Sequence, residues 1–167
     1  RVLAKTGDDQ GLAIGRDALA RAERGGDKLS AVMAHVALGD GYLHGGRIGE
    51  AIEHLERAIT IRDDSGFDMY IVAEASALLS QAYAAQWRAS GNSLTSAATR
   101  SFERSVAQAR AAGRRFGPMK SLAALAQGLR HRLRGRPRQA IACFEDAARL
   151  ASGLGAKLWE AEACFEC

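Results

Sequence analysis

Apolar residues recur every three or four positions along almost the whole chain, the spacing at which side chains share one face of an α-helix. The two clearest stripes comprise Ile48, Ala51, Ile52, Leu55, Ala58 and Ile59 in one segment and Ala140, Ile141, Phe144, Ala147, Ala148 and Ala151 in another. The periodic segments predict eight helices, near residues 10–24, 28–44, 48–63, 68–89, 94–112, 118–134, 137–152 and 157–167. Because the turns between them are short, neighbouring helices should pack as antiparallel hairpins.

Glycine and proline mark where these helices end and begin. Glycine is favoured at helix C-termini, and we expect turns at Gly25, Gly26, Gly45, Gly46, Gly66, Gly91, Gly113, Gly117, Gly135, Gly153 and Gly155. Pro118 and Pro137 fall just inside expected helix starts, where the N–H that proline lacks would have no helical partner.

Composition strengthens the helical interpretation. The chain of 167 residues contains 34 alanines and only two prolines, which are respectively the best and the worst helix former. Aromatic residues make up 6%, and there are few Val, Ile and Thr runs, so a β-sandwich or barrel is disfavoured. No stretch reaches the ~18 apolar residues of a membrane span, so no membrane partner is expected. The predicted fold class is all-α.

A two-part motif recurs three times along the chain. The first copy joins Leu38-Gly39-x-x-Tyr42 to Ala51-x-x-x-Leu55-x-x-Ala58, the second joins Leu79-Ser80-x-x-Tyr83 to Ala98-x-x-x-Phe102-x-x-Ser105, and the third joins Gln127-Gly128-x-x-His131 to Ala140-x-x-x-Phe144-x-x-Ala147. Small residues such as Gly39 would let two helices approach closely, and large ones such as Tyr42 would fill the space against the next hairpin. One hairpin cannot bury its apolar face alone, so the units should stack.

These elements resemble the tetratricopeptide repeat (TPR), whose signature joins L-G-x-x-Y to A-x-x-x-F in a helix–turn–helix unit. The resemblance covers about residues 28–155 and is degenerate in the second copy. The spacing is longer than the ~34 residues of that family, since Leu38 and Leu79 are 41 residues apart and Leu79 and Gln127 are 48 apart. Longer units are similar to the arrays of MalT-type bacterial regulators. An unrelated helical bundle is the alternative.

The resemblance implies an antiparallel helix-hairpin solenoid, a TPR-like superhelix in a single domain. Full repeats are expected near 28–66, 67–113 and 117–155, with half-repeats at 1–27 and 156–167. Both ends interrupt the helical pattern, so we expect a fragment of a larger protein. Three cysteines, an odd number, favour a reducing compartment and hence the cytoplasm.

Residues that could support catalysis or hold a metal form no known motif. Cys164 and Cys167 have zinc-like spacing, but a structural zinc site needs four ligands and no second pair exists. Cys143 is expected to fill space in a helix interface, and His35 and His131 are expected to pack between helices. Because there is no H-E-x-x-H, nucleophile elbow, P-loop or dinucleotide-binding glycine loop, we expect no enzyme, no cofactor and no metal.

In tetratricopeptide folds the first helix of each hairpin lines a concave groove. Transfer of that register assigns ten groove residues, namely Met33, Val36, Asp40, Leu43, Glu74, Gln81, Leu122, Leu125, Leu129 and Arg132. The Lys/Asn carboxylate clamp of chaperone-binding members is missing, and Met and Leu suit an apolar or amphipathic partner helix. If the register is right, Val36→Glu and Leu125→Glu should leave folding intact. The alternative is that neighbouring repeats cover these leucines.

Basic residues are concentrated in one region of a chain whose net charge is +4. Ten Lys/Arg residues and no Asp or Glu lie between Arg104 and Phe144. A patch made of Arg110, Arg114, Arg115, Lys120, Arg130, Arg134, Arg136 and Arg138 could bind phosphates by releasing counterions. Aromatic residues that could stack on bases are scarce nearby, so a solvated surface or a contact with an acidic neighbouring domain is the competing interpretation.

The sequence therefore predicts a non-catalytic protein–protein interaction or effector-sensing scaffold of a bacterial multidomain signalling or transcription-regulatory protein. Its expected partners are a protein, a peptide or neighbouring domains of the same chain, and a homodimer through exposed leucines is a further hypothesis. The alternative function is a nucleic-acid- or phosphate-binding helical domain that uses the basic region 104–138.

Overall fold

The computed structural model describes residues 9–66 and 70–167, with residues 70–72 described by their backbone alone. This part of the chain is all-α, as predicted, with eight α-helices, one short 3-10 turn and no strand. The elements are α2 (Asp9–Gly25), α3 (Lys28–His44), α4 (Ile48–Ser65), α5 (Tyr70–Ala89), α6 (Ser96–Arg115), η1 (Gly117–Met119), α7 (Lys120–Leu133), α8 (Pro137–Gly153) and α9 (Lys157–Glu166). Residues 1–8 of the expected half-repeat 1–27, and the expected helix start at 68, lie outside the described residues.

The helix boundaries follow the local signals in the sequence. Asp27 caps α3 by accepting a 3.1 Å hydrogen bond from the backbone N–H of Ser30, and Thr95 caps α6 in the same way. Pro137 stands in the first turn of α8. Gly66 ends α4 with φ at 66°, a left-handed conformation that glycine adopts without a Cβ penalty.

Gly113 is a correction to the expected set of turn glycines. It lies inside α6, which continues to Arg115, and it is buried. A Cβ at Gly113 would lie 2.7 Å from the Cβ of Ala123 in α7, much closer than real contacts allow. The glycine is therefore used for the close approach of α6 and α7 rather than for a helix end.

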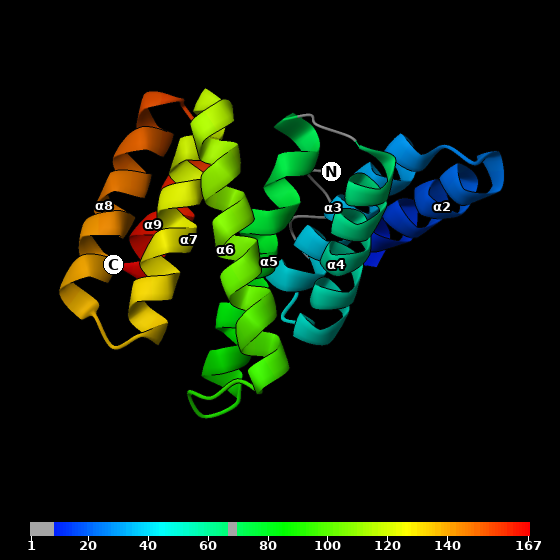
Figure 1. Ribbon diagram of the computed structural model, residues 1–167. Helices are drawn as coiled ribbons and strands as arrows, with labels where there is room; N and C mark the ends of the chain where they lie inside the picture. The colour runs from blue at the N-terminus through cyan, green and yellow to red at the C-terminus, as the bar shows by residue number, and fades with distance from the viewer. Residues whose placement is uncertain (1–8, 67–69) are drawn as a thin grey trace.

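From α2 to α8 the helices follow one another across the molecule, and α9 lies back against α8 and α7 (Figure 1). Each helix packs against the next, and α5 also contacts both α3 and α7. The arrangement places α3, α5 and α7 side by side as an inner set, with α4, α6 and α8 packed on them as an outer set. The buried apolar residues form one continuous cluster that extends from Leu12 in α2 to Ala163 in α9.

Two glycines of the repeated motif permit close packing between an inner helix and the following outer helix. A Cβ at Gly39 of α3 would lie 2.5 Å from Cγ of Leu55 in α4, and one at Gly128 of α7 would lie 2.3 Å from Cε1 of Phe144 in α8. The predicted role of small residues at these positions is thus confirmed. The large residue of the second half of the motif fills the space that the glycine leaves open.

The hydroxyl groups of the two motif tyrosines bond to helices that come earlier in the chain. The hydroxyl of Tyr42 accepts a 3.2 Å hydrogen bond from Arg16 in α2, and the hydroxyl of Tyr83 donates a 2.6 Å bond to Glu56 in α4. Both partners belong to helices that precede the tyrosine's own helix in the chain. A buried hydroxyl needs a hydrogen-bond partner, and here the preceding helices provide it.

Candidate functional site

Most of the residues assigned to an open groove are inside the protein. Val36, Asp40, Leu122, Leu125 and Leu129 are at most 2% exposed, Glu74 is buried as well, and Met33 is clearly exposed at 43%. The register transferred from the tetratricopeptide family predicted that these positions line an open groove. The buried ones lie instead where the inner helices pack against their neighbours. The condition under which Val36→Glu and Leu125→Glu were expected to leave folding intact is not met, because both residues are buried and either change would bury a carboxylate.

A smaller pocket does exist on the inner helices. It has a volume of about 330 Å³ and is formed by α3, α5, α7, α9 and the start of α4. Four of the ten predicted groove residues line it, namely Leu43, Gln81, Leu125 and Leu129. A fifth, Arg132, is bound to Glu166, which lines the same pocket. Four of the ten predicted groove positions therefore line a pocket, whereas most of the ten are buried.

Helix α9 forms one wall of this pocket with a single face. The lining residues of α9 are Leu158, Ala161, Glu162, Phe165 and Glu166, which have the three- and four-residue spacing of one helical stripe. The two α9 carboxylates that line the pocket, Glu162 and Glu166, are both held by basic side chains from the inner helices. Helix α9 therefore contacts the inner set as an amphipathic, acidic helix.

The carboxylate of Glu166 binds two arginines from different helices. Arg88 of α5 donates to both of its oxygens, at 3.0 and 3.2 Å, and Arg132 of α7 also donates to it. The guanidinium of Arg132 lies 4.7 Å from the centre of the Phe144 ring, a cation–π distance that fixes its position. Two preplaced guanidinium groups form a site for one carboxylate.

The second carboxylate of α9 binds a histidine. The Nε2 atom of His44 lies 3.3 Å from Glu162, and its Nδ1 atom lies 3.2 Å from the buried carboxylate of Asp40. The hydrogen bond to Asp40, followed by the one to Glu162, raises the pKa of His44 to about 10. His44 is therefore protonated at neutral pH and links the end of α3 to α9 as a cation.

A second histidine site lies between α3 and α4. His35 is buried as predicted, and its Nδ1 atom lies 2.9 Å from Nδ1 of His54, so one ring donates and the other accepts. Burial, with a further contribution from His54, lowers the pKa of His35 to about 4. The pair is neutral at physiological pH and has a packing role, with the His54 ring stacked on Tyr42.

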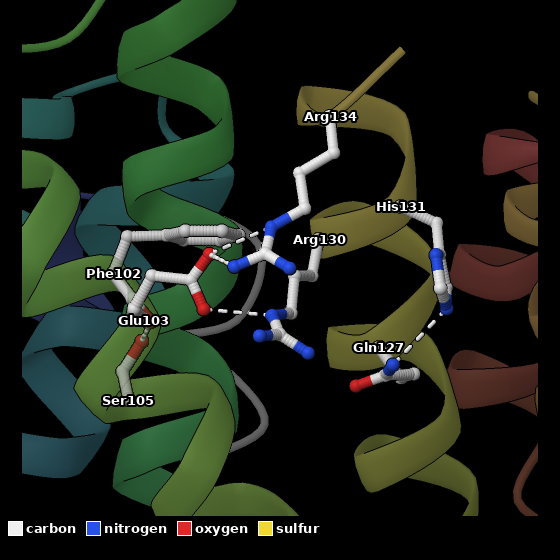
Figure 2. Close-up of polar contacts among 7 residues, drawn as sticks. All are labelled: Phe102, Glu103, Ser105, Gln127, Arg130, His131 and Arg134. Atoms are coloured by element: carbon white, nitrogen blue, oxygen red, sulfur yellow. Dashed lines mark hydrogen bonds and ion pairs between the residues drawn. The ribbon is translucent and has the colours of Figure 1, made fainter. Parts of the chain in front are cut away.

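The predicted basic patch is divided into parts that differ in their pairing. Arg130 and Arg134, one turn apart on α7, both bind Glu103 of α6, at 2.7 and 2.8 Å. Figure 2 shows both side chains reaching Glu103, whereas Gln127 and His131 point to another side of α7. His131 hydrogen-bonds Gln127 at 3.0 Å. Arg130 and Arg134 are thus partly neutralised rather than available as one cationic surface.

The remaining basic residues lie in two places. Arg110, Arg114 and Lys120 line a groove bounded by α6, α7 and α8. The other three, Arg115, Arg136 and Arg138, are exposed near helix ends, and Arg115 lies over the ring of Phe116.

All three cysteines are free thiols. Cys143 is half-buried in α8, whereas Cys164 and Cys167 are exposed. Within residues 9–66 and 70–167, no group of three or more His, Cys, Asp or Glu side chains is placed to hold a metal ion. None of the described helices combines the length and apolar character that crossing a membrane requires.

No family model, no curated protein and no solved structure matches this chain. The residues that sequence reasoning missed are Arg88, His44, Glu103, Glu162 and Glu166. All three acids, Glu103, Glu162 and Glu166, lie outside the acid-free segment that directed attention to the arginines. The sequence signal that could have indicated these ion pairs is the presence of acidic residues outside the basic segment. Only the fold shows which arginine each acidic residue binds.

Proposed function

We propose that the chain is a non-catalytic helical-hairpin repeat module, and that its inner helices bind an amphipathic helical segment of a protein partner or of a neighbouring domain. Stacking of consecutive helix pairs, with α3, α5 and α7 in contact, supports the repeat interpretation. Gly39 and Gly128 support it further, because each leaves space for the large residue in the second half of the same motif copy. These large residues are Leu55 and Phe144.

The observation that carries this proposal is how α9 is bound. A helix with apolar and acidic residues on one face lies against the inner set, with Glu166 on Arg88 and Arg132 and Glu162 on His44. The inner helices therefore present cationic side chains next to apolar ones, and this arrangement matches the acidic and apolar residues on one face of such a helix. The pocket of about 330 Å³ next to α9 leaves room for side chains of a further segment.

The wider setting of this module rests on resemblance alone. Arrays similar to those of MalT-type regulators suggest a role in a bacterial signalling or transcription-regulatory protein. In such a role, a segment that binds the inner helices would shift the whole protein between states only if it bound one state more tightly than the other.

A peptide selection tests the proposal. A phage-displayed library of random peptides is selected on the full chain, and the enriched peptides are synthesised and titrated by calorimetry. Ala85 lines the pocket, so Ala85→Phe should fill it and weaken binding at least tenfold. Ala97 is exposed on α6, away from the pocket, so Ala97→Phe is the matched control and should bind normally.

Two outcomes would contradict the proposal. One is a set of enriched peptides that bind the Ala85→Phe and Ala97→Phe variants equally well. The other is the enrichment of no peptide above background. Circular dichroism of both variants confirms that each keeps its helices, so that a loss of binding reports on the pocket.

A further inference from the structure

Three grooves lie between successive outer helices, each with an inner helix as its floor. The groove between α2 and α4 has a volume of about 420 Å³, the one between α4 and α6 about 170 Å³, and the one between α6 and α8 about 990 Å³. The third groove shares no lining residue with the inner pocket. Its size follows from a floor of small residues, Ala123 and Ala124 of α7, beside Gly113 of α6.

The charge of the third groove also differs from that of the other two. The first groove carries Glu23, Asp27, Lys28, Arg57 and Asp64, and the second carries Glu56 and Arg104, so both contain acids and bases. The third contains Arg110, Arg114, Lys120 and a single acid, Asp146, which is paired with Arg149. In the described part of the chain no carboxylate pairs with Arg110, Arg114 or Lys120.

The molecule itself shows what such an arginine pair binds. Arg130 and Arg134 are one helical turn apart on α7, and together they hold the carboxylate of Glu103. Arg110 and Arg114 have the same four-residue spacing on α6 and face the groove. Residues four apart lie on one side of a helix, about 6 Å apart along it, so both guanidinium groups can reach one carboxylate.

We propose that the groove between α6 and α8 binds an amphipathic helix of a partner protein, with an acidic side chain held by Arg110 and Arg114. The apolar side of that helix lies on Ala123, Ala124 and Leu150, and the two alanines are small enough to let its backbone come close. A second acid, one turn along the bound helix, faces Lys120. This site is independent of the inner pocket and of the function proposed for it.

The lining favours a protein helix over a nucleic acid. No aromatic side chain lines the described groove, so it offers no platform on which bases could stack. Its floor is alanine, which a helix can contact but a phosphate backbone cannot use. Nucleic acid is therefore the competing outcome of the test.

The experiment uses the full chain and a fluorescein-labelled, alanine-based helical peptide with glutamates four residues apart. The control peptide has glutamine in their place, and a duplex oligonucleotide tests the competing outcome. We expect the acidic peptide to bind with salt-dependent affinity and the glutamine peptide at least tenfold more weakly. The double variant Arg110→Gln/Arg114→Gln should weaken binding of the acidic peptide at least tenfold.

Arg100 and Arg104 provide a matched control. They have the same spacing on the same helix and are exposed, but neither lines the groove over α7. The double variant Arg100→Gln/Arg104→Gln should leave binding unchanged. In a Cys164→Ser/Cys167→Ser background, the acidic peptide should also slow alkylation of Cys143, which lines the groove.

Any of four results would overturn the proposal. These are no measurable binding of the acidic peptide, equal weakening by the two double variants, unchanged alkylation of Cys143 in the presence of saturating peptide, and tighter binding of the oligonucleotide than of the peptide. Failure of the inner-pocket experiment would leave this proposal intact, because that experiment changes Ala85 and this one changes α6.

Discussion

Gly128 is the position at which α7 admits the ring of Phe144. The ring is fully buried, and a Cβ on Gly128 would overlap two of its atoms at 2.3 and 2.5 Å. A buried ring has little freedom to move aside, because protein interiors are close-packed. Glycine at this position is therefore needed for space rather than for backbone conformation.

We predict that Gly128→Ala lowers the free energy of unfolding by about 1–3 kcal/mol, the usual cost of overpacking a core. Urea titration followed by circular dichroism measures the change. The control is Gly49→Ala, because nothing lies within 4 Å of a Cβ at Gly49 on α4. The control should leave stability unchanged or raise it slightly, since alanine is the better helix former. Equal effects of the two changes would contradict the packing argument.

At the scale of single elements, α9 is held by charge as well as by packing. Its N-terminal part follows α8 directly, but Glu162 reaches His44 at the end of α3, far away in sequence. The contact is an ion pair only while His44 carries its second ring proton. Because the pKa of His44 is raised to about 10, the proton is retained well above the usual range for histidine.

The raised pKa gives a definite sign to the pH dependence. The stabilisation is fully present below about pH 6.5, the ordinary pKa of histidine, and it is lost as the pH rises towards 10. We predict that the free energy of unfolding falls by about 1 kcal/mol more in the unchanged chain than in His44→Gln between pH 6.5 and 10. Urea titrations at several pH values, followed by tryptophan fluorescence, measure the difference.

His131 provides the control for this prediction. Burial lowers its pKa, so unlike His44 it does not keep its proton into the alkaline range. His131→Gln should therefore follow the pH profile of the unchanged chain. An identical profile for His44→Gln would show that the contact between His44 and Glu162 does not stabilise the fold.

At the scale of the whole molecule, the neighbouring helices decide which residues of α3 and α7 are accessible. Met33 and Val36 lie one turn apart on α3, yet their exposed fractions are 43% and 1%. Leu125 of α7 is 2% exposed. The sequence assigned all three to one groove, whereas the packed array places only Met33 at the surface.

We predict that Val36→Glu and Leu125→Glu each lower the free energy of unfolding by at least about 3 kcal/mol, because each buries an unpaired charge. Met33→Glu should change stability by less than about 0.5 kcal/mol. Thermal unfolding followed by circular dichroism compares the three variants. Native-like stability of Leu125→Glu would mean that α7 presents this residue to solvent after all.

The elements of this protein could be predicted from the sequence because their signals are local. Helical periodicity, Pro137 and the turn glycines act within a few residues, so they place most helix boundaries approximately without knowledge of the fold. The packing role of Gly39 and Gly128 was also predictable, because the repeated motif pairs each with a large residue.

The sites required the tertiary structure because they join residues that are distant in sequence. Glu103 meets Arg130 and Arg134, and Glu166 meets Arg88 and Arg132, so an arginine-rich segment that looks unbalanced in sequence is partly neutralised in space. By itself the sequence determined that the chain is helical and approximately where each described helix lies, since hydrogen bonding and side-chain periodicity are short-range. Only the tertiary structure decided which faces are covered and which charges remain unpaired, since burial and pairing depend on the helices that lie alongside.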